Sequence, residues 1–115
     1  MTDTDEWSFR VDEDGMVFVV APSGVPENVR LAVETVLIPF GDSPDSVESY
    51  LREWRRTAEE LGDDYALATT SAQVRRVGPG EIELGDMYGQ FEDCRMSARE
   101  FERMLGQLID FLKSL

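Results

Sequence analysis

The chain has 115 residues, and its 24 acidic side chains against 11 basic ones give a formal net charge of −13 at pH 7. The length and the apolar fraction of 42% suit one folded domain over residues 1–115. This charge disfavours nucleic acid and anionic membranes as partners, because phosphate binding needs clustered Lys and Arg. It favours instead another protein with a basic surface.

The ends of the chain and its cysteine content bear on its compartment. Residues 1–6 are acidic, whereas a secretory signal is basic and then apolar, so we expect a disordered acidic terminus there. No apolar run reaches the ~18 residues of a membrane span. The single cysteine, Cys94, cannot form an intramolecular disulfide and is expected to be a half-buried strand residue. These features predict a cytoplasmic protein.

The first elements are predicted to be strands. Residues 7–11 alternate apolar and polar side chains, and the apolar run 16–21 indicates a second strand that pairs with the first as a hairpin. The stretch from Asp12 to Gly15 predicts its turn, since Gly15 comes too early for a calcium-binding loop.

A third strand is predicted over residues 29–40. Val29, Leu31 and Val33 alternate with more polar residues, but the pattern fails where Val36 and Ile38 flank another apolar residue. Either a bulge or coverage of both sheet faces explains this, or Val36 and Ile38 belong to an exposed apolar patch.

Two helices carry strong signals. Ser43 and Pro44 predict the start of a helix that ends before Gly62. Ser97 and Glu100 form a Ser-x-x-Glu capping box at the start of a second helix, which runs to the end of the chain. Further strands are predicted over residues 65–77, with a break near residue 71, over 81–84 and over 87–96.

The predicted order is therefore β-β-β-α-β-β(-β)-α. We expect an α+β fold in which an antiparallel sheet of five or six strands carries two amphipathic helices on one face.

The chain lacks the residues on which most enzyme mechanisms depend. The chain has no histidine, and one cysteine cannot supply a metal or redox pair. No phosphate-binding glycine loop is present. We therefore predict no catalytic residues, no metal site, no cofactor and no enzymatic activity. Catalysis by paired carboxylates stays open as an alternative.

The candidate partner-binding residues lie at the end of the first predicted helix. They are Glu59, Glu60, Asp63, Asp64 and Tyr65. Acids at a helix C-terminus oppose the helix dipole, at about 0.3–1 kcal/mol each. This placement suggests selection for something other than stability, and the adjoining tyrosine is a residue type that interfaces enrich.

A second set of residues could provide apolar contacts, including contacts with a second copy of the chain. It consists of Val36, Ile38, Met87, Tyr88, Phe111 and Leu115.

The strand–helix order and the acidity resemble immunity proteins, which neutralise toxin domains, and secretion chaperones, which hold effectors. The resemblance is one of architecture and charge. It implies a non-enzymatic inhibitor or adaptor that engages a basic partner surface. One alternative is a dimeric chaperone-like or structural protein whose acidity reflects a high-salt host. A third hypothesis is a small carboxylate enzyme or ligand-binding domain.

Overall fold

The computed structural model describes residues 6–115, so residues 1–5 of the predicted acidic terminus lie outside the described part. Within that part the chain is an α+β fold with three α-helices, a short 3-10 helix and two antiparallel sheets, of two and four strands. The predicted fold class is confirmed. The predicted single sheet with two helices on one face is wrong.

The N-terminal hairpin forms as predicted. Strand β1 (Ser8–Val11) pairs antiparallel with β2 (Val17–Val20), and Val11 stands opposite Val17. The turn closes where the N–H of Gly15 donates to the carbonyl of Asp12 at 3.1 Å. Gly15 has a φ of 79°, a conformation that glycine adopts without strain.

The predicted third strand is wrong, because residues 29–40 are helical. Helix α1 (Glu27–Leu37) continues into the 3-10 helix η1 (Ile38–Phe40). The buried apolar residues of α1 follow helical spacing: Val29, Ala32, Val33, Val36 and Leu37. Val36 therefore lies in the core, and no bulge is needed to account for it.

The other two helices begin at their predicted caps. In α2 (Pro44–Leu61), Ser43 accepts a hydrogen bond from the N–H of Ser46 at 3.2 Å, and Gly62 ends the helix with a φ of 71°. In α3 (Ala98–Lys113), Ser97 accepts from the N–H of Glu100 at 3.1 Å.

The four-stranded sheet has the simple order β3-β4-β5-β6. Its strands are β3 (Tyr65–Ala66), β4 (Ala72–Arg76), β5 (Glu81–Asp86) and β6 (Cys94–Ser97). The chain leaves regular strand geometry between β3 and β4, where the sequence predicted a break. Alternate residues of β4 and β5 face the core, so the other face of the sheet is solvated.

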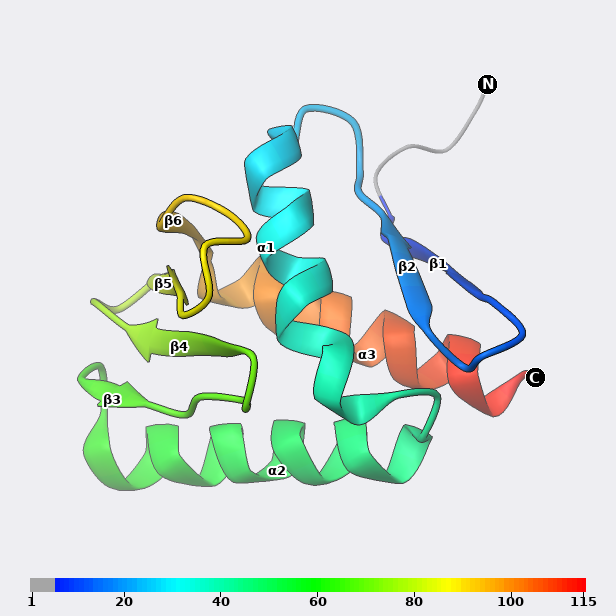
Figure 1. The fold of residues 1–115 in the computed structure, drawn as a ribbon. Helices are drawn as coiled ribbons and strands as arrows, with labels where there is room; N and C mark the ends of the chain where they lie inside the picture. The colour runs from blue at the N-terminus through cyan, green and yellow to red at the C-terminus, as the bar shows by residue number, and fades with distance from the viewer. Residues whose placement is uncertain (1–5) are drawn as a thin grey trace.

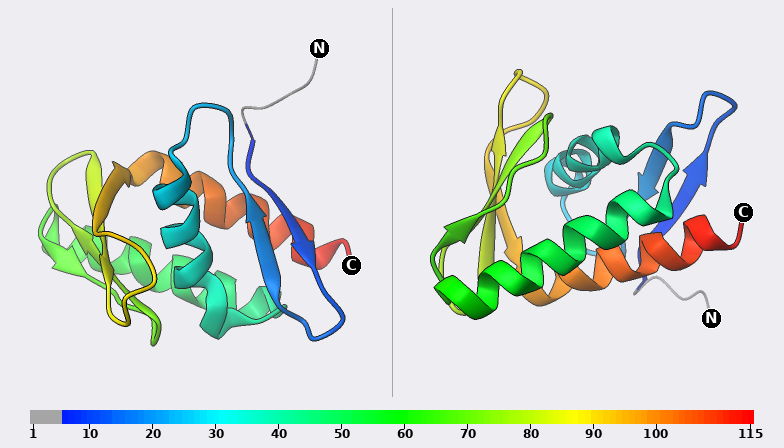
Figure 2. Two further views of the ribbon diagram at one scale, coloured as in Figure 1. Left: turned by 45° about the horizontal axis from the view of Figure 1, so that its top comes forward. Right: turned by 90° about the horizontal axis from the view of Figure 1, so that it is seen from below.

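Helix α1 lies between the hairpin and the four-stranded sheet, while α2 and α3 run side by side (Figures 1 and 2). This placement explains the correction to the fold. Because a helix occupies the position predicted for the third strand, the hairpin cannot join the other strands and forms its own sheet.

The core is centred on Trp54, which has no exposed side-chain surface. Its ring lies 4.7 Å from that of Tyr65 and 5.3 Å from that of Phe101, both edge-on. The hydroxyl of Tyr50 donates to the Leu67 carbonyl at 2.5 Å and ties α2 to the segment after β3. This packing fixes α2, α3 and the sheet as one frame, against which α1 rests.

Candidate functional site

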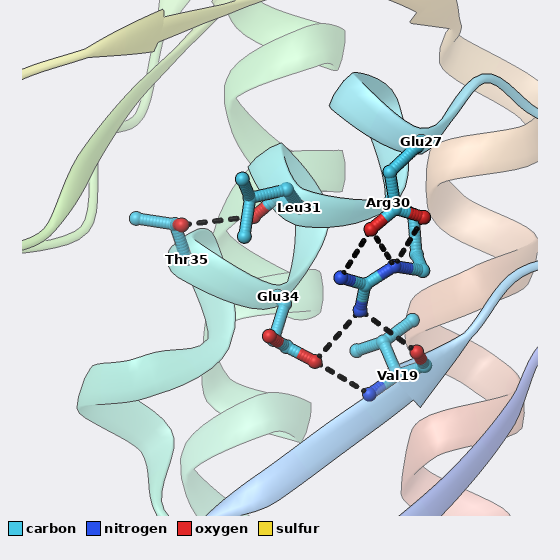
Figure 3. Close-up of polar contacts among 6 residues, drawn as sticks. All are labelled: Val19, Glu27, Arg30, Leu31, Glu34 and Thr35. Atoms are coloured by element: carbon cyan, nitrogen blue, oxygen red, sulfur yellow. Dashed lines mark hydrogen bonds and ion pairs between the residues drawn. The ribbon is translucent and has the colours of Figure 1, made fainter. Parts of the chain in front are cut away.

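Side chains of α1 hold the outer edge of β2 (Figure 3). The carboxylate of Glu34 accepts a hydrogen bond from the N–H of Val19 at 2.9 Å, and Arg30 donates to the carbonyl of the same residue at 3.1 Å. Arg30 also pairs with Glu34 at 3.0 Å and with Glu27 at 2.7 Å. Since the free edge of the strand is satisfied in this way, the hairpin is fixed in one position on α1.

A hollow of about 310 Å³ lies beside this clamp, on the outward face of α1. Its floor is made by residues of α1 and η1 at helical spacing, on the side opposite the core-facing stripe. One wall comes from the start of β2 and the other from the β5–β6 loop. We name this surface the α1 hollow; its lining is Met16, Val17, Leu31, Glu34, Thr35, Ile38 and Gln90.

The hairpin wall of the α1 hollow is held by an acidic turn. Oδ1 of Asp12 accepts hydrogen bonds from the N–H groups of Asp14 and Met16, each at 2.9 Å. A Cβ atom at Gly15 would lie 3.5 Å from the carboxylate of Asp42, so the connection between η1 and α2 brings Asp42 to the same turn. The turn therefore positions Met16, with the Asp12 carboxylate on its N–H and the Asp42 carboxylate beside the preceding residue, Gly15.

The β5–β6 loop, which forms the other wall of the α1 hollow, is also held by backbone hydrogen bonds to a carboxylate. A carboxylate oxygen of Asp86 accepts hydrogen bonds from the N–H groups of Gln90 at 3.0 Å and Tyr88 at 3.1 Å. These backbone hydrogen bonds, that of Gln90 first, lower the pKa of Asp86 below its ordinary range. Asp93 in turn accepts from the N–H of Asp86 at 2.9 Å. The loop that carries Gln90 is thus folded around two carboxylates.

Two further contacts fix loops to α1. Asn28 exchanges two hydrogen bonds with the backbone of Glu92, at 2.7 and 2.9 Å. The hydroxyl of Ser71 donates to the Thr35 carbonyl at 2.5 Å. The α1 hollow is therefore bounded by segments with defined positions.

The acids on both sides of the α1 hollow differ from Glu34 in its floor, which pairs with Arg30. Among residues 6–115, none of those on either side takes part in an ion pair. We call them the acidic rims: Asp12, Glu13, Asp14 and Asp42 on the hairpin side, and Asp86, Glu92 and Asp93 on the loop side. An apolar surface therefore lies between two sources of uncompensated negative charge.

The acids that the sequence singled out are in a different electrostatic state. Glu59, Glu60, Asp63 and Asp64 are all exposed, at the end of α2 and just beyond it. Three of them lie near arginines, in the pairs Glu60–Arg56 at 3.0 Å, Asp63–Arg76 at 3.7 Å and Asp64–Arg75 at 3.8 Å. This cluster carries less free charge than its sequence suggested, and its role in binding stays a prediction.

Tyr65, which was predicted as a surface anchor, is only 5% exposed. Its ring packs against Trp54, and its hydroxyl accepts a hydrogen bond from Arg76 at 3.2 Å. Burial of the phenol raises the pKa of Tyr65, and Arg76 partly opposes that rise. The ring therefore belongs to the core and is not exposed as a surface anchor.

The predicted apolar contacts fall into three groups. Val36 is buried, and Phe111 is half-buried against the ring of Phe9 at 5.8 Å. Leu115 is exposed at the end of the chain, away from the α1 hollow. Ile38 is 44% exposed and lines the hollow.

Met87 and Tyr88, the other predicted apolar contacts, are exposed on the loop that forms one wall of the hollow. The Tyr88 hydroxyl lies 3.5 Å from the carbonyl of Thr70, next to the Ser71 contact with α1. The loop that carries Met87 and Tyr88 thus contributes Gln90 to the same hollow that Ile38 lines.

Of the residues that line the α1 hollow, Ile38 alone was predicted as a contact residue; the others are Met16, Val17, Leu31, Glu34, Thr35 and Gln90. Leu31, Glu34 and Thr35 had a detectable signal. Once residues 29–40 are interpreted as a helix, these three and Ile38 form a second stripe at helical spacing, outside the core-facing one. Met16, Val17 and Gln90 had none, because their position beside α1 follows from tertiary packing.

A larger hollow of about 530 Å³ lies between α2 and α3 and includes the side chains of Glu48, Glu59 and Arg56. Glu48 pairs with Lys113 at 2.9 Å, so the carboxylates here do not form a free pair. Among the residues that the structure describes, no group of three or more His, Cys, Asp or Glu side chains is arranged to hold a metal ion.

Cys94 lies on β6 and is half-buried, as predicted. Burial, with the nearby charges of Asp93 and Glu83, raises the pKa of its thiol. This environment disfavours the reactive thiolate.

Within residues 6–115, no helix combines the length and the apolar character that crossing a membrane requires. No family model, curated protein or solved structure matches this chain.

Proposed function

We propose that this protein is a non-enzymatic binding domain that engages a basic surface of another protein, as an acidic inhibitor or adaptor does. The observation that supports this most directly is the pairing of an apolar hollow with acidic rims that have no ion-pair partners within residues 6–115. Charge of this kind accelerates encounter with a basic surface, and apolar contact then slows dissociation. If the partner acts on nucleic acid, the rim carboxylates would occupy the positions of phosphates.

The α1 hollow favours this role over the third hypothesis. Its volume of about 310 Å³ is at the lower end of the range of small-molecule sites. The Glu34 carboxylate in its floor already accepts from the N–H of Val19 and from Arg30. A carboxylate held in this way is poorly placed to act as a general base.

The dimeric alternative would place the same hollow against a second copy of the chain. A symmetric contact at this face would bring acidic rims together, and like charges at an interface oppose association. We therefore expect a monomer at all accessible concentrations, as measured by light scattering. A dimer that the variant Ile38→Ser abolishes would favour the alternative.

The test of the proposed function is the rate of association with a partner captured on the immobilised chain from cells that contain it. Raising the ionic strength from about 0.05 to 0.5 M should lower that rate about tenfold or more. The rim variant Glu13→Gln/Asp14→Asn/Glu92→Gln should lower the rate at low salt. A rate that does not depend on salt would contradict the proposal.

A matched control removes the same amount of charge elsewhere. Glu6, Asp45 and Asp110 are exposed, lie outside the predicted binding residues and have no ion pair among residues 6–115. The variant Glu6→Gln/Asp45→Asn/Asp110→Asn therefore has the net charge of the rim variant but intact rims. It should associate at nearly the unaltered rate. Equal losses in the two variants would mean that net charge, and not the rims, guides the partner.

A further inference from the structure

We infer that the α1 hollow receives one apolar side chain of the partner, presented between basic residues. The inference rests on the proposed function and names the chemistry of the partner segment: a basic residue, an apolar residue and a second basic residue. It is carried by three properties of the hollow, namely its polar groups, its walls and the position of its charge.

The polar groups of the floor offer little to a polar ligand. The hydroxyl of Thr35 donates to the carbonyl of Leu31 at 2.8 Å (Figure 3). Oε2 of Glu34 accepts from Val19 and from Arg30. Among the described residues the second oxygen of this carboxylate has no hydrogen bond, but Arg30 already balances its charge, so a polar side chain that entered the hollow would lose water for few new hydrogen bonds. An apolar side chain would instead remove the surfaces of Leu31 and Ile38 from water.

The walls have defined positions before any partner arrives. Asp12 holds the N–H of Met16, and Asp86 holds the N–H of Gln90, through hydrogen bonds of 2.9 and 3.0 Å. The hydroxyl of Ser71, in the segment before β4, donates a hydrogen bond to the carbonyl of Thr35 in the floor. Little conformational entropy would be lost when the hollow is filled, so even one inserted side chain can contribute measurably to affinity.

The charge lies on both sides of the hollow. One rim belongs to the hairpin turn and the other to the β5–β6 loop, with α1 between them (Figures 1 and 2). A segment that crosses α1 would therefore meet carboxylates before and after the hollow. Arg30, the base nearest this floor, is already shared between Glu27 and Glu34. The complementary segment has Lys or Arg on both sides of its apolar residue.

The probes are three blocked peptides: Arg-Arg-Leu-Arg-Arg, Arg-Arg-Ala-Arg-Arg and Glu-Glu-Leu-Glu-Glu. Each is titrated into the full chain labelled with ¹⁵N, and amide shifts are followed by NMR. We expect the basic leucine peptide to shift the amides of Leu31, Thr35, Ile38 and Gln90. It should bind at least about fivefold more tightly than the alanine peptide, because more apolar surface is buried. The acidic peptide should not bind.

Two substitutions locate the leucine side chain. Ile38→Ser should abolish the preference for leucine over alanine, since Ile38 lines the hollow and is 44% exposed. The matched control is Leu61→Ser, because Leu61 is 60% exposed at the end of α2 and lies outside the hollow. It should keep the full preference. Met16→Ser removes part of the hairpin wall of the hollow and should also abolish the preference for leucine. The dispersion of the amide signals reports whether each variant is folded.

The inference and the proposed function fail differently. Equal affinity for the leucine and alanine peptides, or no binding of either, would overturn the inference. Salt-dependent association with the protein partner could still hold in that case. Selective binding of the leucine peptide together with a salt-insensitive partner rate would have the opposite meaning: the inference would stand, and the charge-guided function would be rejected.

Discussion

The carboxylate of Glu34 lies 2.9 Å from the backbone nitrogen of Val19, and this single hydrogen bond links the second helical face of α1 to the edge of the hairpin. Arg30 completes the link from one turn earlier, at the carbonyl of the same valine. The hairpin has only two strands, which are marginal alone, so its position depends on such contacts and on the apolar contact with α3.

The first prediction concerns this link. Glu34→Ala should lower the free energy of unfolding by about 1–3 kcal/mol, because it leaves the N–H of the buried Val19 without its acceptor. Urea unfolding at an unchanged m-value measures the loss. Glu27→Ala is the control, since Glu27 holds the same Arg30 from an exposed position. It should lose clearly less stability than Glu34→Ala does, and equal losses would show that the contact with Val19 is unimportant.

A second prediction compares two neighbouring arginines on β4. Arg76 donates to the carbonyls of Gly78 at 2.7 Å and Pro79 at 2.6 Å, and its side chain is 13% exposed. Lysine cannot reproduce this forked geometry, so Arg76→Lys should lower the free energy of unfolding by about 1–3 kcal/mol. Arg75→Lys alters a side chain that is 61% exposed and should cost less than about 1 kcal/mol. Urea unfolding measures the stability of both variants. Similar unfolding midpoints would show that the hydrogen bonds of Arg76 to the turn do not stabilise the fold.

A third prediction concerns alkaline pH. Burial raises the pKa of Tyr50 above its ordinary value of 10.0. The unfolded chain therefore loses this proton at a lower pH than the folded chain does. The resulting stabilisation is complete below about pH 10 and is lost as the pH rises further, with a slope of up to about 1.4 kcal/mol per pH unit.

Tyr50→Phe isolates this contribution. The variant also loses the hydrogen bond to Leu67, so it starts from a lower stability, but its decline between about pH 10 and 11 should be shallower. Tyr65, Cys94 and Lys113, whose pKa values are also raised, are present in both proteins and cancel in the comparison. Parallel pH profiles of the two proteins would show that Tyr50 is not the source of the slope.

A fourth prediction separates a partner-related origin of the acidity from adaptation to a salt-rich host. At a net charge of −13 the folded chain repels itself, and salt should raise its stability as the Debye length falls from about 30 Å at 0.01 M to about 3 Å at 1 M. We expect the chain to remain folded at about 0.01 M salt, with a cooperative urea transition. A chain that unfolds at 0.01 M salt would favour the high-salt explanation.

Local signals predicted α2, α3 and the first hairpin well, because each has its own cap or turn residues. Ser43, Gly62, Ser97 and Gly15 all occupy the positions that the sequence assigned to them. Such signals depend on hydrogen bonds between residues that are close in the sequence, so they can be recognised without knowledge of the fold. The packing of the hairpin against α1 depends on distant residues and was not predictable.

Helix α1 was mistaken for a strand for a reason that also concerns the site. Leu31 of the outward stripe stands between Val29 and Val33 of the core-facing stripe, and the three residues alternate with more polar ones. Such alternation is typical of a half-buried strand. Leu31, which obscured the helical period, is one of the residues that line the α1 hollow.

The acidic rims could likewise not be identified from the sequence alone. The sequence drew attention to Glu59, Glu60, Asp63 and Asp64 because they are adjacent and oppose a helix dipole. The acidic rims are dispersed along the chain, from Asp12 to Asp93, and only the fold gathers them. Which acids have arginine partners is equally a property of the fold.

Glu34 belongs both to the floor of the α1 hollow and to the link with Val19, so occupancy of the hollow is coupled to local opening of the hairpin. If the hairpin leaves α1, the wall formed by Met16 and Val17 leaves with it, and an occupant can bind only the closed form. Filling the hollow at about 100 times the dissociation constant would then add about 2.7 kcal/mol to the opening free energy, which is about a hundredfold slower exchange of the Val19 amide hydrogen. The Val19 amide, which does not line the hollow itself, would thus report whether the hollow is filled.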